Sequence, residues 1–225
     1  MAAKLLTLLM MLLSLGQGAI DAYVEEMNLG GYLFLVNRDY PIAADYVPPD
    51  LVKVQVSAVN SDIKMRAEAA RALEDMFAAA QADGCQLVAV SGYRSYGQQA
   101  SIHERKVKAV GKKAALRVSA PPGCSEHQLG LAMDLGRKNN VALSESFGSS
   151  PEGIWVAENC HRFGFIIRYK AEWEDITGYA YEPWHIRYVG TAHAERIHAL
   201  DIPYEYYAAQ LREAHFAQAL GGTKQ

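Results

Sequence analysis

The spacing of apolar residues predicts a long helix in the first half of the chain. Ser61 or Asp62 can cap its start, and Gly84 follows as a stop signal after about Asp83. Along this segment, apolar side chains recur at the spacing of one helix face: Ala70, Leu73, Met76, Phe77 and Ala80. We therefore expect these side chains to face the core.

Short apolar runs predict strands, and further helices are interspersed with them. The expected strands cover residues 86–90, 131–135, 165–169 and 184–189. The further helices are expected over about 96–110, from 150 to about 164, over about 191–200 and over about 204–218. These elements do not alternate as in a doubly wound sheet. The predicted fold class is therefore α+β, an antiparallel sheet backed by helices.

The N-terminus has the order of a secretory signal. Lys4 precedes an apolar run over residues 5–15, which is shorter than the roughly 20 apolar residues of a transmembrane helix. Small residues follow the run: Gly16, Gly18, Ala19 and Ala22. We predict a signal peptide over residues 1–22, a mature chain that begins between Ala19 and Tyr23, and export from the cytoplasm. A leader retained as an anchor and an ordinary N-terminal helix are the alternatives.

Composition and charge narrow the classes of function. The chain has 225 residues, 50% of them hydrophobic, which predicts one compact domain over about residues 27–220. The formal net charge is −3 and the pI is about 6.2, so nothing indicates a nucleic-acid binder. We expect a monomer with no stable protein partner. Apolar residues interrupt the basic run of Lys106, Lys108, Lys112 and Lys113, which is typical of a solvated helix face.

The three cysteines, Cys85, Cys124 and Cys160, are too scattered for a zinc-finger spacing. Export would permit a disulfide, and we predict one between Cys124 and Cys160 that leaves Cys85 free. The alternative is three free thiols that behave as small hydrophobic side chains.

Polar residues stand out within three otherwise apolar segments, at residues 91–99, 125–134 and 182–190. In the second segment, strand alternation places Asp134 on the face opposite its apolar neighbours, where a buried carboxylate must be paired or bound to a metal. Gly130 permits a tight turn, so that His127 and Asp134 can converge on one cation. The residue types and their spacing therefore favour a metal site.

The third segment supplies the rest of a catalytic metal site. His185 would complete a set of three protein ligands, which leaves the fourth tetrahedral position of zinc for water. Glu182, separated from His185 by a rigid proline and a tryptophan, is well placed to be the general base. Each segment taken singly is a weak signal, and the combination is far more specific.

Together, these motifs resemble the VanY-type D-alanyl-D-alanine carboxypeptidases, in subfamily B of zinc peptidase family M15. The resemblance covers about residues 32–215. The motif S-x-H-x-x-G-x-A-x-D begins at Ser125, E-x-W-H begins at Glu182, and S-G-Y-R-S begins at Ser91. The resemblance implies a Hedgehog/DD-peptidase-like zinc peptidase fold. It implies that His127, Asp134 and His185 are the zinc ligands.

The resemblance also implies roles for polar residues around the metal. Glu182 matches the catalytic base, and Arg94 matches the arginine that polarises the scissile carbonyl. Ser125 and Gln99 match residues that line the substrate site and help to hold the terminal carboxylate, for which such side chains are suitable donors. The alternatives are a structural ion pair for Arg94, with Glu104 or another acid, and local turn or helix hydrogen bonds for Ser125 and Gln99.

The implied function is a zinc-dependent D-alanyl-D-alanine carboxypeptidase that trims peptidoglycan stem peptides outside the cytoplasm, at the cell wall or membrane. The motifs are shared with L,D-carboxypeptidases, which act on the stem tetrapeptide, so that activity is the main alternative. A non-catalytic cell-wall-binding module is disfavoured because Glu182 and Arg94 are present. A structural zinc site would need a fourth protein ligand, for which Cys124 is the candidate nearest His127.

Overall fold

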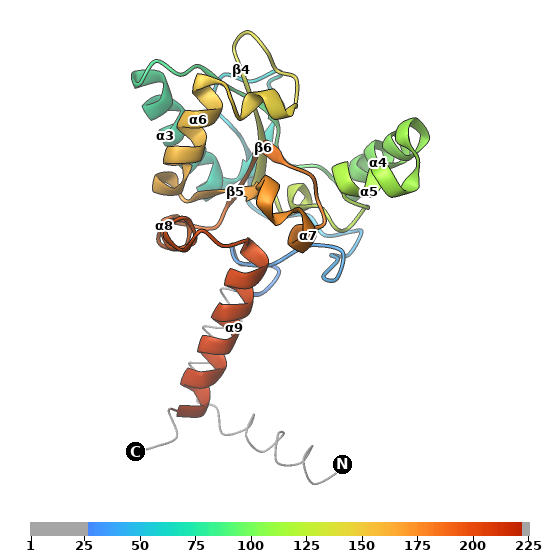
Figure 1. Cartoon of the computed structure of the whole chain (residues 1–225), viewed down its shortest axis with the longest axis vertical. Coiled ribbons are helices and arrows are strands. Elements are labelled where there is room, and N and C mark those ends of the chain that lie inside the picture. The colour runs from blue at the N-terminus through green and yellow to red at the C-terminus, as the bar shows by residue number, and fades with distance from the viewer. Residues whose placement is uncertain (1–26, 222–225) are drawn as a thin grey trace. The chain divides into compact units, whose positions relative to one another are not determined.

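The structure is a computed structural model that describes residues 27–221 (Figure 1). It contains two compact units, one of which is Val36–Pro203. Among the described residues, the other unit joins residues 27–35 with helix α9 (Tyr204–Gly221), and the Tyr204 hydroxyl donates to the Leu33 carbonyl over 2.7 Å. The predicted signal peptide lies outside the described residues. Between residues 27 and 221, none of the helices is long and apolar enough to span a membrane.

A four-stranded antiparallel sheet forms the centre of the larger unit (Figure 1). Its strand order is β3-β4-β6-β5, with β3 at Leu87–Ser91, β4 at Ala132–Arg137, β5 at Phe165–Tyr169 and β6 at Glu182–Tyr188. A separate pair is made by β1 (Leu51–Lys53) and β2 (Lys64–Arg66). The four strands expected from the sequence are thus all present within two residues of their predicted limits, and the α+β class is confirmed.

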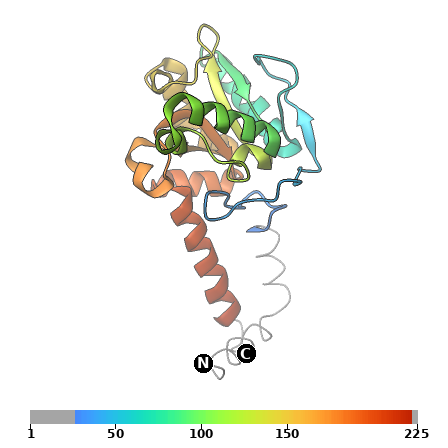
Figure 2. The same cartoon turned by 90° about the vertical axis from the view of Figure 1, so that its right-hand side faces the viewer.

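Helices lie on both sides of this sheet. Helices α3 (Ala67–Ala82) and α6 (Pro151–Asn159) pack on one face, and α4 (Tyr96–Val110) and α5 (Lys112–Val118) lie on the other (Figures 1 and 2). The remaining elements of this unit are η1 (Glu126–Leu129), η2 (Glu145–Phe147), η3 (Cys160–Phe163), η4 (Ala171–Trp173), α7 (Glu174–Thr177) and α8 (Thr191–Leu200). Strand β4 is buried on both sides, because one face meets the core and the other meets η1 and the loops near it.

The predicted start of the long helix was wrong. Helix α3 begins at Ala67, not at Ser61 or Asp62, because residues 64–66 pair with β1 as a strand. The Arg66 amide donates to the Gly130 carbonyl over 2.8 Å, which holds this strand against the turn before β4. The predicted end at Asp83 and the predicted core face are confirmed, since all five of the expected side chains are buried.

The predicted disulfide was also wrong. All three cysteines lie in the described range, and each has a free thiol. Cys160 is buried at the start of η3, where burial raises the pKa of its thiol to about 12. Cys124 lies on the loop before η1, partly exposed and close to the charge of Arg38. The two side chains occupy different surroundings, and the alternative of free thiols describes the structure.

Candidate metal centre

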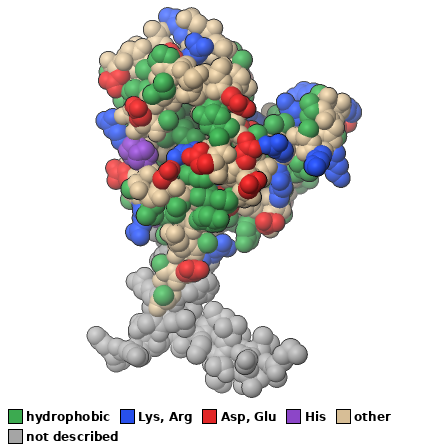
Figure 3. All heavy atoms as spheres, viewed as in Figure 1, with side chains coloured by type: hydrophobic (Ala, Val, Ile, Leu, Met, Phe, Trp, Pro, Cys, Tyr) green, Lys and Arg blue, Asp and Glu red, His purple; other side chains and the backbone are tan. Residues whose placement is uncertain are grey.

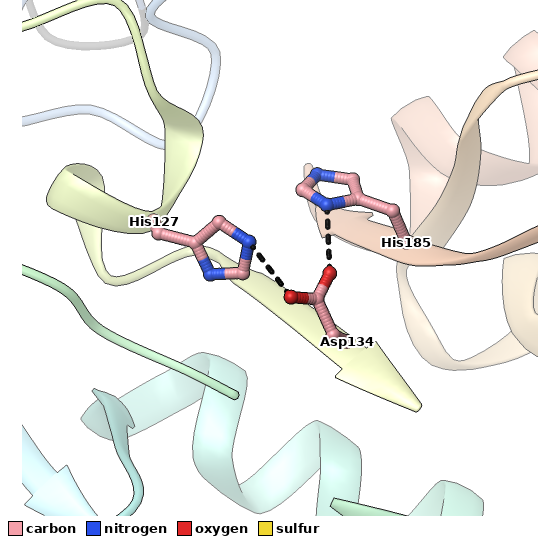
Figure 4. Close-up of side chains that lie close together, drawn as sticks. All are labelled: His127, Asp134 and His185. Carbon is pink, nitrogen blue, oxygen red and sulfur yellow. Dashed lines mark hydrogen bonds and ion pairs between the residues drawn. The ribbon is translucent and has the colours of Figure 1, made fainter. Parts of the chain in front are cut away.

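Strand pairing brings two of the predicted metal ligands together. Asp134 on β4 lies directly opposite His185 on β6, and directly opposed residues of an antiparallel pair project from the same face. His127 reaches the same point from η1 (Figure 4). One potential ligand atom from each of the three residues lies within 4.8 Å of the others, and all three residues are buried. The structure thus brings together the three ligands expected from the sequence.

Two glycines near the candidate ligands leave no room for a Cβ. Gly130 ends η1 with φ at +67°, and a Cβ there would lie 2.8 Å from the Leu51 side chain. At Gly92 a Cβ would meet the Lys64 carbonyl oxygen at 2.4 Å. The Gly92 carbonyl oxygen lies 2.7 Å from His127 Nδ1, so this close backbone approach also holds the ring of His127.

The ring nitrogens of the two histidines divide their contacts in a way that suits metal ligation. His127 turns Nδ1 to the Gly92 carbonyl and Nε2 towards Asp134 Oδ2, 3.3 Å away. His185 turns Nδ1 to Asp134 Oδ1 over 3.0 Å, and its Nε2 lies 3.3 Å from Glu126 Oε2. In each ring, one nitrogen therefore faces Asp134, within the group of candidate ligands. The other, the outer nitrogen, faces an acceptor outside this group. Two imidazole nitrogens and a carboxylate oxygen are a ligand set that suits zinc.

The charges of the three residues depend on burial and on each other. Burial, with the charge of Arg94, lowers the pKa of His127 to about 4. Burial also opposes the charged form of His185, but its hydrogen bonds to Asp134 and Glu126 outweigh burial and raise its pKa to about 9. Burial alone would raise the pKa of Asp134, yet the nearby His127 and Arg94 hold it well below its usual range. The site is therefore built around an ionised carboxylate.

Glu182 lies at the first position of β6, beside the three candidate ligands. It pairs with Tyr169 across an irregularity in the β5–β6 register, a feature that often accompanies functional sites. Burial raises the pKa of Glu182 to about 7, and the charges of His185 and Arg94 only partly oppose this. A carboxyl group with a pKa near neutrality can both accept and return a proton at physiological pH.

Arg94 lies in the cavity but is not paired with Glu104. Its Nη2 contacts Asp134 Oδ2, its Nε donates to Ser91 Oγ over 2.8 Å, and its Nη1 lies 3.3 Å from Gln99 Oε1. Glu104 is instead paired with Lys108 on the same helix. Arg94 thus forms an ion pair with Asp134, which is itself one of the candidate ligands.

Gln99 and Ser125 occupy the positions expected of lining residues. Both are buried and border a cavity of about 470 Å³ that also contains Arg94 and Glu182. The side-chain nitrogen of Gln99 donates to the Ala120 carbonyl over 2.8 Å while its oxygen faces Arg94, so its contacts in the structure hold Arg94 in place. Ser125 precedes η1, and its side chain does not cap that turn.

Other residues of this cavity were not expected from the sequence. Among the described residues, the buried hydroxyls of Ser119 and Tyr179 have no hydrogen-bond partner, and both residues border the cavity. Lys106 also borders it and is partly buried, so it does not belong to a solvated face. The other lysines of the basic run, Lys108, Lys112 and Lys113, are exposed. They belong to α4 and α5, over which Lys and Arg side chains gather (Figure 3). No motif position indicated these three cavity residues.

The most buried acidic residue of the site is Glu126, which the sequence interpretation passed over. It is 1% exposed and contacts His185, Arg168 and Arg187. Burial would raise its pKa, but the two arginines outweigh burial and hold the pKa of Glu126 well below its usual range. Its position between Ser125 and His127 was the available signal. Cys124, the candidate fourth ligand, is not in the group of described residues that converge on the site.

Known proteins resemble this chain over most of its length. Residues 62–191 match the family model of VanY, D-alanyl-D-alanine carboxypeptidase. The protein YodJ of Bacillus subtilis (strain 168) is 44% identical over 199 residues, which cover 86% of this chain and 73% of YodJ.

Two solved structures share the fold. One is the LdcB LD-carboxypeptidase, with a TM-score of 0.75 and 45% identity over 80% of this chain and 86% of that one. The other is a mutant of the vancomycin-resistance D,D-pentapeptidase VanY in complex with Zn(II). It has a TM-score of 0.65 and 37% identity over 78% of this chain and 98% of that one.

Proposed function

Because the chain belongs to the VanY D-alanyl-D-alanine carboxypeptidase family, we propose that it is a zinc-dependent carboxypeptidase that removes the terminal D-alanine of peptidoglycan stem peptides. The observation that carries this proposal is the convergence of His127, Asp134 and His185 beside Glu182 in one cavity. A site that held zinc only for structure would not need a carboxyl group with a pKa near neutrality next to three ligands.

The residues present fit a zinc ion. His127 Nε2, His185 Nδ1 and a carboxylate oxygen of Asp134 would hold it, and each histidine already has an acceptor for its outer nitrogen. The VanY structure with Zn(II) supports the choice of metal. When bound, zinc would polarise the scissile carbonyl and make water a better nucleophile near neutral pH.

The protein's own groups supply the proton transfers and the charge stabilisation. Glu182 takes a proton from the attacking water and returns it to the amine of the departing D-alanine, which its raised pKa permits. Arg94 donates to the oxygen of the scissile carbonyl as negative charge develops there. Ser125, together with the unpartnered hydroxyls of Ser119 and Tyr179, would donate to the terminal carboxylate of the substrate.

An L,D-carboxypeptidase activity is the second candidate. The LdcB LD-carboxypeptidase shares 45% identity and the fold with this chain. The two activities differ in the residue that precedes the released D-alanine, and the same ligands, base and arginine would serve both. The metal centre therefore does not distinguish the two activities, and an assay with both kinds of substrate is needed to separate them.

Purified zinc-loaded protein, incubated with stem tripeptide, tetrapeptide and pentapeptide, separates these candidates. The released amino acid and the shortened peptide are identified by mass spectrometry. Release of D-alanine from the pentapeptide supports D,D-carboxypeptidase activity, and release from the tetrapeptide supports the L,D activity. If neither peptide is shortened while zinc is bound, the proposed function is wrong.

We also propose that the protein acts outside the cytoplasm, because its proposed substrate lies there and the sequence begins with the order of a secretory signal. N-terminal sequencing of protein from the culture medium or cell envelope tests this. A first residue between Ala19 and Tyr23 is expected, and intact protein confined to the cytosol would contradict the proposal.

A further inference from the structure

The outer nitrogen of His185 faces a carboxylate in a cluster of buried charges. Glu126 and Arg168 are each 1% exposed, and Arg187 is 0% exposed. Arg168 Nε donates to Glu126 Oε1 over 2.8 Å, and Arg187 Nη1 donates to the same oxygen over 3.0 Å. The other oxygen, Oε2, lies 3.3 Å from His185 Nε2. Glu126 thus gives one oxygen to the arginines and the other to the histidine.

From this division of contacts, we infer that Glu126 is a positioning residue that fixes His185 as a metal ligand through Nδ1. An arginine can only donate hydrogen bonds, and a carboxylate paired with two arginines can only accept them. The nitrogen of His185 that faces Glu126 must therefore carry the proton. In the neutral ring that ligates a metal, the lone pair then lies on Nδ1, which faces Asp134. The inference rests on the zinc site of the proposed function.

Two neighbouring strands carry the arginines of this cluster. Arg168 belongs to β5 and Arg187 to β6, and Arg187 Nε also donates to the Tyr188 carbonyl over 2.9 Å. The Arg168 guanidinium lies 4.9 Å from the centre of the Tyr169 ring, which in turn lies 5.0 Å from the centre of the His185 ring. The His185 ring is thus in contact with an aromatic ring as well as with Glu126, and both contacts favour the same ring orientation.

The substitution Glu126→Gln tests this role with little change of shape. An amide keeps one acceptor oxygen and presents a donor in place of the other, so Arg168, Arg187 or His185 must lose its acceptor. We expect the dissociation constant for Zn²⁺, measured by competition with a chromophoric chelator, to rise about 10- to 100-fold. Circular dichroism and thermal denaturation of the same samples show whether the variant is folded.

Glu68→Gln is the matched control. It makes the same chemical change at a carboxylate of α3 that accepts from the Tyr188 hydroxyl over 2.7 Å. Tyr188 lies on the same strand as His185, but this hydrogen bond does not involve the His185 ring. Zinc affinity should stay within about twofold of the wild-type value, because no ligand loses an acceptor. A folded Glu126→Gln protein with wild-type zinc affinity would overturn the inference and leave the proposed function intact. A wild-type protein that binds no zinc would overturn both.

The tautomer of His185 gives a second readout that does not depend on the variant's folding. Zinc-loaded wild-type protein with ¹⁵N-labelled histidine is examined by long-range ¹H–¹⁵N NMR. We expect the proton of His185 on Nε2 and that of His127 on Nδ1, because their outer acceptors, Glu126 and the Gly92 carbonyl, face those atoms. A proton on Nδ1 of His185, with the metal on Nε2, would overturn the inference even if Glu126→Gln does not fold.

Discussion

At the scale of single residues, Glu182 is the group on which the proposed chemistry depends. Its carboxyl group has no positive partner strong enough to offset burial, which is why its pKa rises to about 7 whereas that of Asp134 falls. The pKa values of these two neighbouring carboxyl groups are thus shifted in opposite directions. Such a difference in environment is typical of sites in which one acid binds charge and the other transfers protons.

Replacement of Glu182 by glutamine should remove the proton acceptor and leave the metal bound. We expect kcat to fall about 10²- to 10⁴-fold, because the amide has nearly the same shape but cannot take a proton from water. Stoichiometric zinc in the purified variant, by metal analysis, checks the second half of the prediction. Glu145→Gln is the control, since Glu145 borders the same cavity but is exposed, and it should keep the wild-type kcat. Zinc loss in Glu182→Gln would make Glu182 a ligand and not the base.

The raised pKa of Glu182 also predicts a pH dependence. The base must be ionised, so kcat/KM should fall as pH decreases through the pKa of Glu182 in the free enzyme. Burial places this pKa at about 7, and a bound cation would draw it back towards the ordinary value of 4.5. The acidic limb of kcat/KM should therefore lie between these values. A profile that stays flat down to about pH 4, with the fold intact by circular dichroism, would exclude Glu182 as the base.

The sequence was sufficient to predict that the three candidate ligands converge, and the structure places them on η1 and on the paired strands β4 and β6. His127, Asp134 and His185 are residue types that ligate metals, and it is their combination in two motifs that indicates the chemistry. Glu126 could not be assigned in the same way, because its role depends on Arg168 and Arg187, which only the pairing of β5 with β6 brings to it. The contact of Arg94 with Asp134 likewise depends on the register of β3 with β4.

At the scale of elements, local signals succeeded where the contacts that fix an element are local. Helix α4 begins where it was predicted, because Ser95 and Gln98 form a reciprocal capping box, and it ends at Val110 with Gly111 as its C-cap. The start of α3 was missed because its first predicted turn is instead a strand, held by β1 and by the Gly130 carbonyl. Both partners lie outside this segment, Gly130 far along the chain, and no pattern within residues 61–66 shows them.

The turn at Gly130 gives a prediction at this scale. Gly130→Ala places a Cβ 2.8 Å from the Leu51 side chain at a φ of +67°. We expect the free energy of unfolding to fall by about 2–3 kcal/mol, from left-handed backbone strain together with displacement of the Leu51 and Arg66 side chains. Gly84→Ala has a similar φ of +85° but nothing within 4 Å of its Cβ, so it should lose only about 1 kcal/mol. Urea denaturation measures both, and equal losses would show that packing at Gly130 contributes little.

At the scale of the whole molecule, the candidate site joins segments that are far apart in the chain. His127 comes from η1, Asp134 from β4 and His185 from β6, and β3 contributes Ser91 on the opposite side of β4. A ligand that binds only the folded arrangement stabilises it in proportion to the logarithm of its concentration over its dissociation constant. Removal of zinc is therefore expected to affect stability and activity together.

A chelator and a β-lactam should accordingly have opposite effects. Treatment with excess chelator should abolish peptide hydrolysis and lower the melting temperature, and added Zn²⁺ should restore both. A penicillin should change neither, because no serine of the cavity has a histidine to activate it. Ser91 Oγ accepts from Arg94, and the ring nitrogens of His127 and His185 face Gly92, Asp134 and Glu126. Hydrolysis assays and calorimetry on the same samples make the comparison. A covalent penicillin adduct on Ser91 or Ser125 with loss of activity, or full activity after the metal is removed, would contradict the metal-dependent mechanism.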